Sequence, residues 1–318
     1  MLRTAPEQGL LERLGIGNRS SYSFTIPERD EAGFRALTEL EDKGLNVVAD
    51  ALGQATEHVV SFFTMLRAEV GFYVGCLNLH ERLAQKSEPM CFPHPLDGGK
   101  HVLAARGLYD PCLTLHLEGR AVGNDVDAEG KSLVMITGAN QGGKSTFLRS
   151  VGLAQLMMQC GMFVCAESFA ADICKGVFTH FKREEDATMT SGKLDEELAR
   201  MSEIAEGIGP GCMLLCNESF AATNEAEGSE IARQVIRAML DSGIKVVFVT
   251  HLFDLAHGLH AQGRKHALFL RAERRPDGSR TFRVIEGEPL PTSYGADSYR
   301  RIFGEDREAA PALAEGGG

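Results

Sequence analysis

The chain has 318 residues, of which 43% are hydrophobic, and this length suits one large α/β domain with a smaller addition, or two modest domains. Its formal net charge of −11 argues against a surface devoted to non-specific nucleic-acid binding, and its eight cysteines include no C-x-x-C pair and do not indicate a disulfide framework. No apolar segment stands out as long enough to cross a bilayer, and the N-terminus lacks the apolar core of a secretory signal. We therefore expect a cytoplasmic protein with no membrane contact.

The first part of the chain predicts a helical arm. Residues 1–28 form a mixed segment with a short β-like run, Tyr22–Ile26. From 29 to about 90, apolar residues recur at three- and four-residue steps, with one interruption at Gly44. A pattern of this length needs a partner helix to cover its apolar face. The arm is either a helical hairpin that supports the next domain or a lever that transmits motion.

The remainder predicts an α/β domain over residues 100–303. A Pro- and Gly-rich stretch, 87–100, reads as a linker. Beyond it, strands alternate with helices, which indicates a largely parallel sheet with helices on its faces. The predicted strands are 101–104, 112–117, 133–136, 176–181, 213–216, 245–249 and a hairpin of 266–272 with 280–285; the predicted helices run to about 160 and over 194–208, 226–240 and 253–259. The acidic, then Ala/Pro/Gly-rich tail, 304–318, is expected to be disordered.

A phosphate-binding pattern lies between the strand 133–136 and the helix that follows it. The residues Gly138–Ser145 read GANQGGKS, in the strand–loop–helix setting that a P-loop requires. Glycines let backbone N–H groups turn toward phosphate oxygens, and the helix adds its positive N-terminal end. Lys144 is predicted to contact the β- and γ-phosphates, and Ser145 to ligate Mg²⁺. The predicted nucleotide-binding residues are Gly138, Ala139, Asn140, Gln141, Gly142, Gly143, Lys144, Ser145 and Thr146.

Hydrolysis needs further groups, and the apolar strand about 70 residues later ends in two candidates. Glu218 is predicted to act as a general base or to position the attacking water. Asn217 stands where such ATPases usually carry aspartate, and its amide oxygen can ligate Mg²⁺, although less firmly than a carboxylate. The other interpretation of this pair is an ordinary strand-to-loop transition.

The next apolar strand ends at His251. Because ligands lie at the carboxyl ends of the strands in such sheets, we expect Gly138, Glu218 and His251 to converge on one site. A neutral imidazole there can hydrogen-bond the γ-phosphate or the attacking water. The other interpretation is a capping or solvated histidine. The predicted catalytic residues are therefore Lys144, Glu218 and His251.

These motifs resemble the ATPase domain of the MutS DNA mismatch-repair family, a branch of the ABC-type ATPases. The similar segments are TGANQGGKSTFLRSVGLAQLMMQCGMFVCAES at the P-loop, LLCNESFAATNEAEGSEIA after it, and FVTHLFDLA at the family's histidine switch. Thr292–Gly295 looks like the family's closing motif, and Ala121–Asp127 like the strand that enters the nucleotide site. The resemblance covers roughly residues 30–303, and it implies a P-loop NTPase domain joined to a helical core and lever.

The resemblance also implies cofactors and partners. These are ATP, Mg²⁺, a homodimer with composite nucleotide sites and DNA as a candidate partner in repair or recombination. Three features depart from the family pattern. Asn217 replaces the usual aspartate. The signature segment near 190–198 lacks its Ser-Thr-Phe core, so that Ser191 is the candidate substitute, while Asp195 and Glu196 are expected to face solvent or form the first helical turn. Too few residues precede 30 for the mismatch-reading domains, which a chain complete at this length would lack.

Three hypotheses follow. The first is an ATP-hydrolysing MutS-related dimer. The second is a non-hydrolysing switch that binds ATP, dimerises and recruits a partner, which Asn217 favours. The third, a DNA-binding structural module, conflicts with the acidic charge. The arginine-rich run 264–283 is expected to be a solvated face of the hairpin rather than a contact for the phosphate backbone of DNA.

Overall fold

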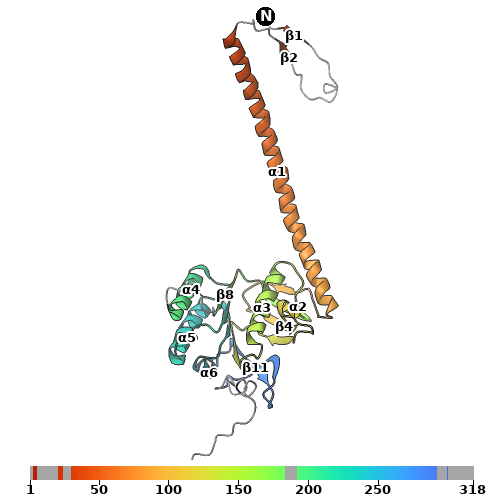
Figure 1. The fold of residues 1–318 in the computed structure, drawn as a ribbon. Coiled ribbons are helices and arrows are strands. Elements are labelled where there is room, and N and C mark those ends of the chain that lie inside the picture. The colour runs from red at the N-terminus through yellow and green to blue at the C-terminus, as the bar shows by residue number, and fades with distance from the viewer. Residues whose placement is uncertain (1–2, 6–20, 24–29, 183–191, 292–298, 300–318) are drawn as a thin grey trace, which may run out of the picture. The chain divides into compact units, whose positions relative to one another are not determined.

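The computed structural model describes residues 3–5, 21–23, 30–182, 192–291 and 299. The chain divides into two units, Met1–Gly75 and Cys76–Gly318 (Figure 1). The first unit holds β1 (Arg3–Ala5) and β2 (Ser21–Ser23), which pair antiparallel. It also holds most of α1, which extends into the second unit.

The helix α1 runs without a break over Glu31–Gln85, so the predicted interruption at Gly44 is wrong. Asp30 begins the helix, because its side chain accepts a hydrogen bond from the Gly33 amide at 2.9 Å. A glycine inside a helix costs only about 1 kcal/mol relative to alanine, which does not end a helix this long.

Apolar side chains along α1 are exposed, among them Leu45 at 67% and Phe62 at 55%. One 18-residue window of α1 has a mean hydropathy of 1.3 and is long and apolar enough to span a membrane. This differs from the expectation that no segment reaches that length. The match is one of length and composition only, and a helix that packs on other helices has the same composition.

The second unit is built on a six-stranded sheet in the order β12-β11-β6-β10-β9-β8. All neighbours are parallel except the β11–β12 hairpin. The strands are β6 (Leu133–Gly138), β8 (Val177–Phe181), β9 (Met213–Asn217), β10 (Lys245–Val249), β11 (Ala267–Arg274) and β12 (Arg280–Glu286). The predicted α/β class and the predicted hairpin are confirmed.

Helices cover both faces of this sheet, as Figure 1 shows. Successive side chains of a strand point to opposite faces, so Val134 and Ile136 join one apolar cluster while Leu133 and Met135 join the other. The first cluster includes α3 (Lys144–Gln159), and the second includes α4 (Lys193–Gly207), α5 (Glu225–Asp241) and α6 (Phe253–Ala261). Burial on both faces explains why these strands are continuous apolar runs in the sequence.

A smaller sheet, in the order β3-β7-β4-β5, was not predicted. Its strands are β3 (His94–Leu96), β4 (Leu103–Leu108), β5 (Asn124–Asp127) and β7 (Ser168–Asp172). β3 lies inside the segment predicted as a linker. The predicted strand 112–117 is wrong, because α2 occupies Pro111–His116. Asp110 caps α2 by accepting hydrogen bonds from the amides of residues 112 and 113, and proline at the first helical position favours the helix.

Candidate functional site

The loop between β6 and α3 has a backbone that only glycines accommodate easily. Gly138 and Gly143 have φ angles of 102° and 92°, in the left-handed region. A Cβ on Gly138 would lie 2.8 Å from the Ala272 amide nitrogen, and one on Gly142 would lie 2.7 Å from the Ala272 Cβ. The loop is therefore pressed against β11. This close packing fixes the direction in which its N–H groups point.

The helix α3 begins at this loop with Gly143 as its N-cap, which provides no side-chain hydrogen bond. The first N–H groups of a helix have no partner within the helix, and they attract anions together with the helix dipole. Ser145 and Thr146 lie in this first turn. This is the strand–loop–helix setting in which the sequence predicts a phosphate cradle.

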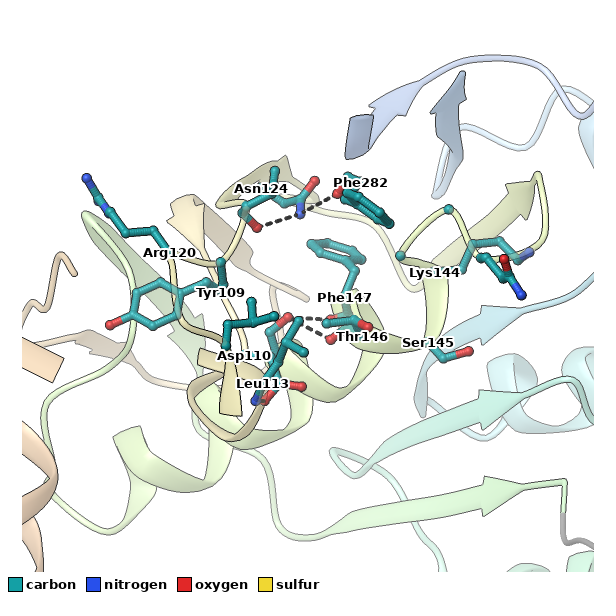
Figure 2. A pocket seen from close by; sticks show the side chains of 17 residues that line it. Tyr109, Asp110, Leu113, Arg120, Asn124, Lys144, Ser145, Thr146, Phe147 and Phe282 are labelled. Carbon is teal, nitrogen blue, oxygen red and sulfur yellow. Dashed lines mark hydrogen bonds between the residues drawn. The ribbon is translucent and has the colours of Figure 1, made fainter. Parts of the chain in front are cut away.

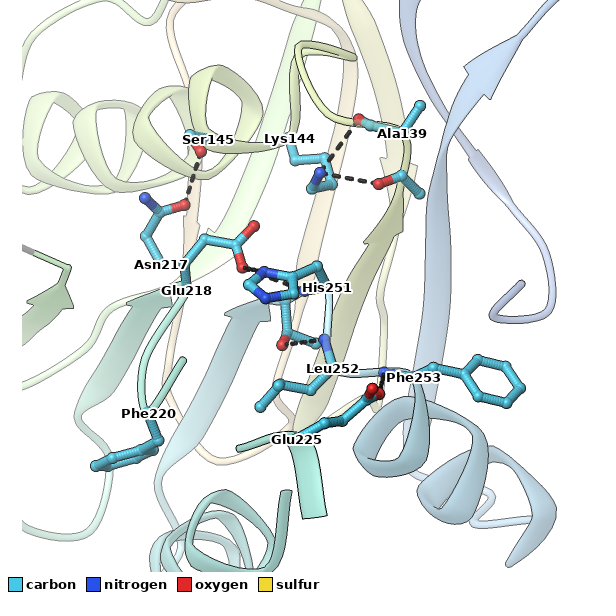
Figure 3. A network of polar contacts seen from close by, with 12 residues as sticks. Ala139, Lys144, Ser145, Asn217, Glu218, Phe220, Glu225, His251, Leu252 and Phe253 are labelled. Carbon is cyan, nitrogen blue, oxygen red and sulfur yellow. Dashed lines mark hydrogen bonds and ion pairs between the residues drawn. The ribbon is translucent and has the colours of Figure 1, made fainter. Parts of the chain in front are cut away.

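Lys144 is buried at the base of the loop, with 5% of its surface exposed. Its Nζ donates hydrogen bonds to the carbonyl oxygens of Gly138, at 2.9 Å, and Ala139, at 3.1 Å (Figure 3). Burial lowers the pKa of Lys144, and the nearby Glu218 carboxylate opposes this shift. An anionic ligand at the loop would likewise stabilise the ammonium form.

The two predicted metal ligands are in contact. Ser145 donates a hydrogen bond from its Oγ to the Oδ1 of Asn217 at 2.7 Å, which joins the start of α3 to the end of β9. Two neighbouring oxygen atoms suit Mg²⁺ as ligands, because this ion prefers oxygen and keeps several waters. Both side chains that carry these oxygens are neutral. Within the described ranges, no cluster of three or more His, Cys, Asp or Glu side chains is placed to hold a metal.

Glu218 and His251 also meet, because they follow the neighbouring strands β9 and β10. The Oε2 of Glu218 accepts hydrogen bonds from the His251 backbone amide at 3.2 Å and from its Nδ1 at 2.5 Å. This pairing with Glu218 raises the pKa of His251, which favours the protonated ring rather than the neutral imidazole expected from the sequence. The expected convergence of the three strand ends is present. The chemical roles of these side chains remain predictions.

A cavity of about 560 Å³ adjoins the loop, and its lining includes Leu113, Val122, Asn124, Phe147 and Phe282 (Figure 2). Phe282 has 51% of its surface exposed, so its ring is open to a ligand. An apolar, aromatic-lined cavity beside a phosphate loop suits the base and ribose of a nucleotide.

Asn124 holds the two sides of this cavity together. Its Oδ1 accepts a hydrogen bond from the Val284 amide at 2.6 Å, and its Nδ2 donates to the carbonyls of Phe282 and Val122 at 3.3 Å each. The side chain therefore joins β5 to β12, two strands that belong to different sheets.

The sequence did not identify three residues of this site. Phe282 and Asn124 had no assigned side-chain role, although the strand containing Asn124 was expected near the nucleotide. Arg280 was grouped with a solvated arginine face, but its Nε donates to the Asn140 carbonyl of the loop at 3.2 Å. Only the register of the β11–β12 hairpin brings Phe282 and Arg280 to the loop, and no local motif encodes that register.

Three predicted features lie outside the described residues: Ser191, Thr292–Gly295 and the tail 304–318. Asp195 and Glu196 lie in the first turn of α4, as expected.

Comparison with known proteins gives two family matches. The model for MutS domain V matches residues 134–302, and the model for the MutS2 N-terminal domain matches residues 1–86. Among similar curated proteins, MutS protein homolog 4 of Homo sapiens is 25% identical over 250 residues, covering 75% of this chain and 25% of that protein. The DNA mismatch repair protein MutS of Chloroflexus aurantiacus is 30% identical over 162 residues, covering 49% of this chain and 16% of that protein. The protein of that name from Clostridium kluyveri is 26% identical over 261 residues, covering 80% and 29%. The chain thus spans less than a third of the length of each of these relatives.

Proposed function

The chain belongs to the MutS family. We propose that this protein binds ATP together with Mg²⁺ and hydrolyses the ATP. The observation that carries the proposal is the convergence of five side chains at the carboxyl ends of β6, β9 and β10. These are Lys144, Ser145, Asn217, Glu218 and His251.

The phosphates of ATP would lie on the first turn of α3, where backbone N–H groups and the ammonium of Lys144 neutralise negative charge. Arg280, which donates a hydrogen bond to the Asn140 carbonyl, adds positive charge beside the same loop. The base and ribose would occupy the cavity beside Phe282. The site would thus hold both ends of the nucleotide.

Mg²⁺ bound by Ser145 and Asn217 would neutralise charge on the phosphate oxygens. Glu218 would orient the attacking water and take up its proton. His251 holds one oxygen of this carboxylate, and the hydrogen bond from its backbone amide fixes the direction of the carboxylate. A fixed carboxylate loses less orientational freedom when the water is positioned.

We propose further that two copies assemble with composite nucleotide sites and act on DNA in repair or recombination. The support is the likeness of the sequence to MutS domain V and to relatives that include DNA mismatch repair proteins. Binding to duplex, mismatched and branched DNA, measured with and without ATP, tests this part.

Phosphate release by purified protein tests the ATPase assignment. We expect Mg²⁺-dependent turnover that Lys144→Ala and Glu218→Gln abolish, while Glu218→Gln retains ATP binding. Full turnover in the Glu218→Gln protein would contradict the assigned mechanism.

The second candidate is a non-hydrolysing switch. The neutral Ser145–Asn217 pair favours it, because a metal held without a carboxylate is bound less firmly. ATP binding and ATP-dependent dimerisation, with phosphate release equal to buffer, would identify the switch.

A further inference from the structure

The turn that carries Glu218 has an unusual backbone. Glu218 and Phe220 have φ angles of 56° and 62°, in the left-handed region that residues other than glycine rarely adopt. Two such residues on either side of Ser219 persist only where their surroundings hold them. The surroundings of this turn therefore determine where the Glu218 carboxylate points.

One holding contact comes from α4. Glu197 is buried, with 4% of its surface exposed, and its Oε2 accepts a hydrogen bond from the Phe220 amide at 2.6 Å. Without this acceptor the Phe220 N–H would be buried and unsatisfied. The Glu197 carboxylate thus replaces the backbone carbonyl that would accept this hydrogen bond in a helix or a sheet.

A second contact comes from β8. His180 is fully buried, its Nδ1 lies 2.7 Å from the Ser219 Oγ, and its ring stacks on Phe220 with centroids 5.5 Å apart. Its Nε2 lies 3.0 Å from the Glu197 carbonyl oxygen, which can only accept, so this nitrogen carries a proton. Burial lowers the pKa of His180, consistent with a neutral ring.

The third side of the turn is closed by α5. A Cβ added at Gly228 would lie 2.4 Å from the Phe220 carbonyl oxygen, so the helix backbone itself packs against the turn. Three elements thus enclose Ser219 and Phe220. Of the two polar side chains that hold these residues, Glu197 alone belongs to α4.

We propose that Glu197 is a positioning residue for Glu218, and that it links the placement of α4 to the direction of the candidate catalytic carboxylate. This inference rests on the proposed ATPase function. The segment predicted to reach the partner's nucleotide, near 190–198, overlaps the start of α4 and includes Glu197. A movement of α4 would then displace the Glu218 carboxylate, because the hydrogen bond from the Phe220 amide to Glu197 ties the turn 218–220 to this helix.

Three variants test the proposal. Glu197→Ala removes the acceptor, Glu197→Gln keeps an acceptor oxygen at the same reach, and Glu203→Ala is a control at an exposed position of the same helix. For each variant we would measure kcat, the KM for ATP, and amide hydrogen exchange of the peptide covering 217–221.

We expect Glu197→Ala to lower kcat by ~10–100-fold, because small displacements of a reacting group have effects of this size. The KM for ATP should stay within about twofold, because the phosphate loop is untouched. Exchange at 217–221 should accelerate at least about tenfold, as expected when a buried amide loses its hydrogen bond. Glu197→Gln should recover most of kcat and the slow exchange, and Glu203→Ala should match the wild type.

Wild-type kcat and exchange in Glu197→Ala would overturn the proposal, and so would a Glu197→Gln protein as impaired as Glu197→Ala. If Glu197→Ala does not fold, Glu197→Asp replaces it, since it keeps the charge but shortens the reach by one methylene. A wild-type protein without turnover would refute the proposed ATPase function. The exchange of 217–221 in the three variants would then decide by itself whether Glu197 holds the turn.

Discussion

Replacing Asn124 with alanine removes the side chain that joins β5 to β12, and its cost can be worked out from the contacts. The bond from the Val284 amide is short, at 2.6 Å, while those to Phe282 and Val122 are long, at 3.3 Å each. Asn124 is 8% and Val284 is 5% exposed, so water cannot readily replace the lost partner. With ~1–3 kcal/mol for the buried amide left unsatisfied and roughly 0.5 kcal/mol for each long bond, the free energy of unfolding should fall by about 2–4 kcal/mol.

Urea unfolding of the second unit, followed by far-ultraviolet circular dichroism, measures this change as a lower midpoint at an unchanged denaturant slope. Asn124→Asp is the matched control. It keeps the acceptor for Val284 but turns an oxygen in place of Nδ2 toward the carbonyls of Phe282 and Val122, so it should exceed the stability of the alanine variant only at a pH low enough to protonate the carboxyl group, which can then donate a hydrogen bond. ATP affinity should fall in Asn124→Ala as well, because Phe282 lies at the released edge. A stability loss below about 0.5 kcal/mol with unchanged ATP affinity would refute this account, since that is the range of ordinary surface substitutions.

Three further predictions concern the site itself. Asn217→Asp should place a carboxylate beside Ser145 and lower the Mg²⁺ concentration needed for half-maximal phosphate release by ~10-fold, since Mg²⁺ favours charged oxygen ligands; an unchanged Mg²⁺ requirement would exclude Asn217 as a ligand. Phe282→Ala should weaken binding of ATP by ~10-fold, the order of one lost stacking contact, and leave tripolyphosphate binding unchanged; equal losses for both ligands would place the base elsewhere. The raised pKa of His251 gives a stabilising contribution that is complete below the imidazole's ordinary value of 6.5 and is lost as the pH rises through the higher value of the folded protein. The thermal stability of the wild type should therefore fall more steeply over this range than that of His251→Gln, and parallel profiles would contradict the pairing with Glu218.

Much of the second unit was predictable because its strands are buried on both faces and its helices carry regular apolar steps. The helix α5 and the strands β9 and β10 lie within one residue of their predicted bounds. The errors fall where a local signal competed with capping or with distant pairing. Residues 112–117 have an apolar composition that suits a strand, but Asp110 and Pro111 begin a helix there. The strands β3 and β7 are short, and their pairing joins residues more than 70 positions apart, which no local pattern reveals.

The same distinction holds for the candidate site. Its strand-end residues were predictable, because a parallel sheet brings successive carboxyl ends to one edge. Phe282 and Arg280 were not, because they reach the loop only through the turn and bulge of the hairpin. The residues around Glu218 show a further limit. His180 and Glu197 contact the turn from two other elements. Glu197 falls within the predicted signature segment, but no pattern near either residue in the sequence indicates a contact with this turn.

The two carbonyls that hold Lys144 affect what ligand binding costs. A free lysine side chain loses ~1.5–2 kcal/mol of rotamer entropy when it is fixed in one conformation. In this loop the ammonium is already fixed by Gly138 and Ala139 and already shielded from most of the surrounding water. Folding has therefore taken up both the entropic and the desolvation cost before a nucleotide arrives. A phosphate that enters the loop meets an ammonium group that is already positioned by these two carbonyls. Less of the favourable interaction between phosphate and ammonium is therefore offset by ordering the side chain, and binding is tighter.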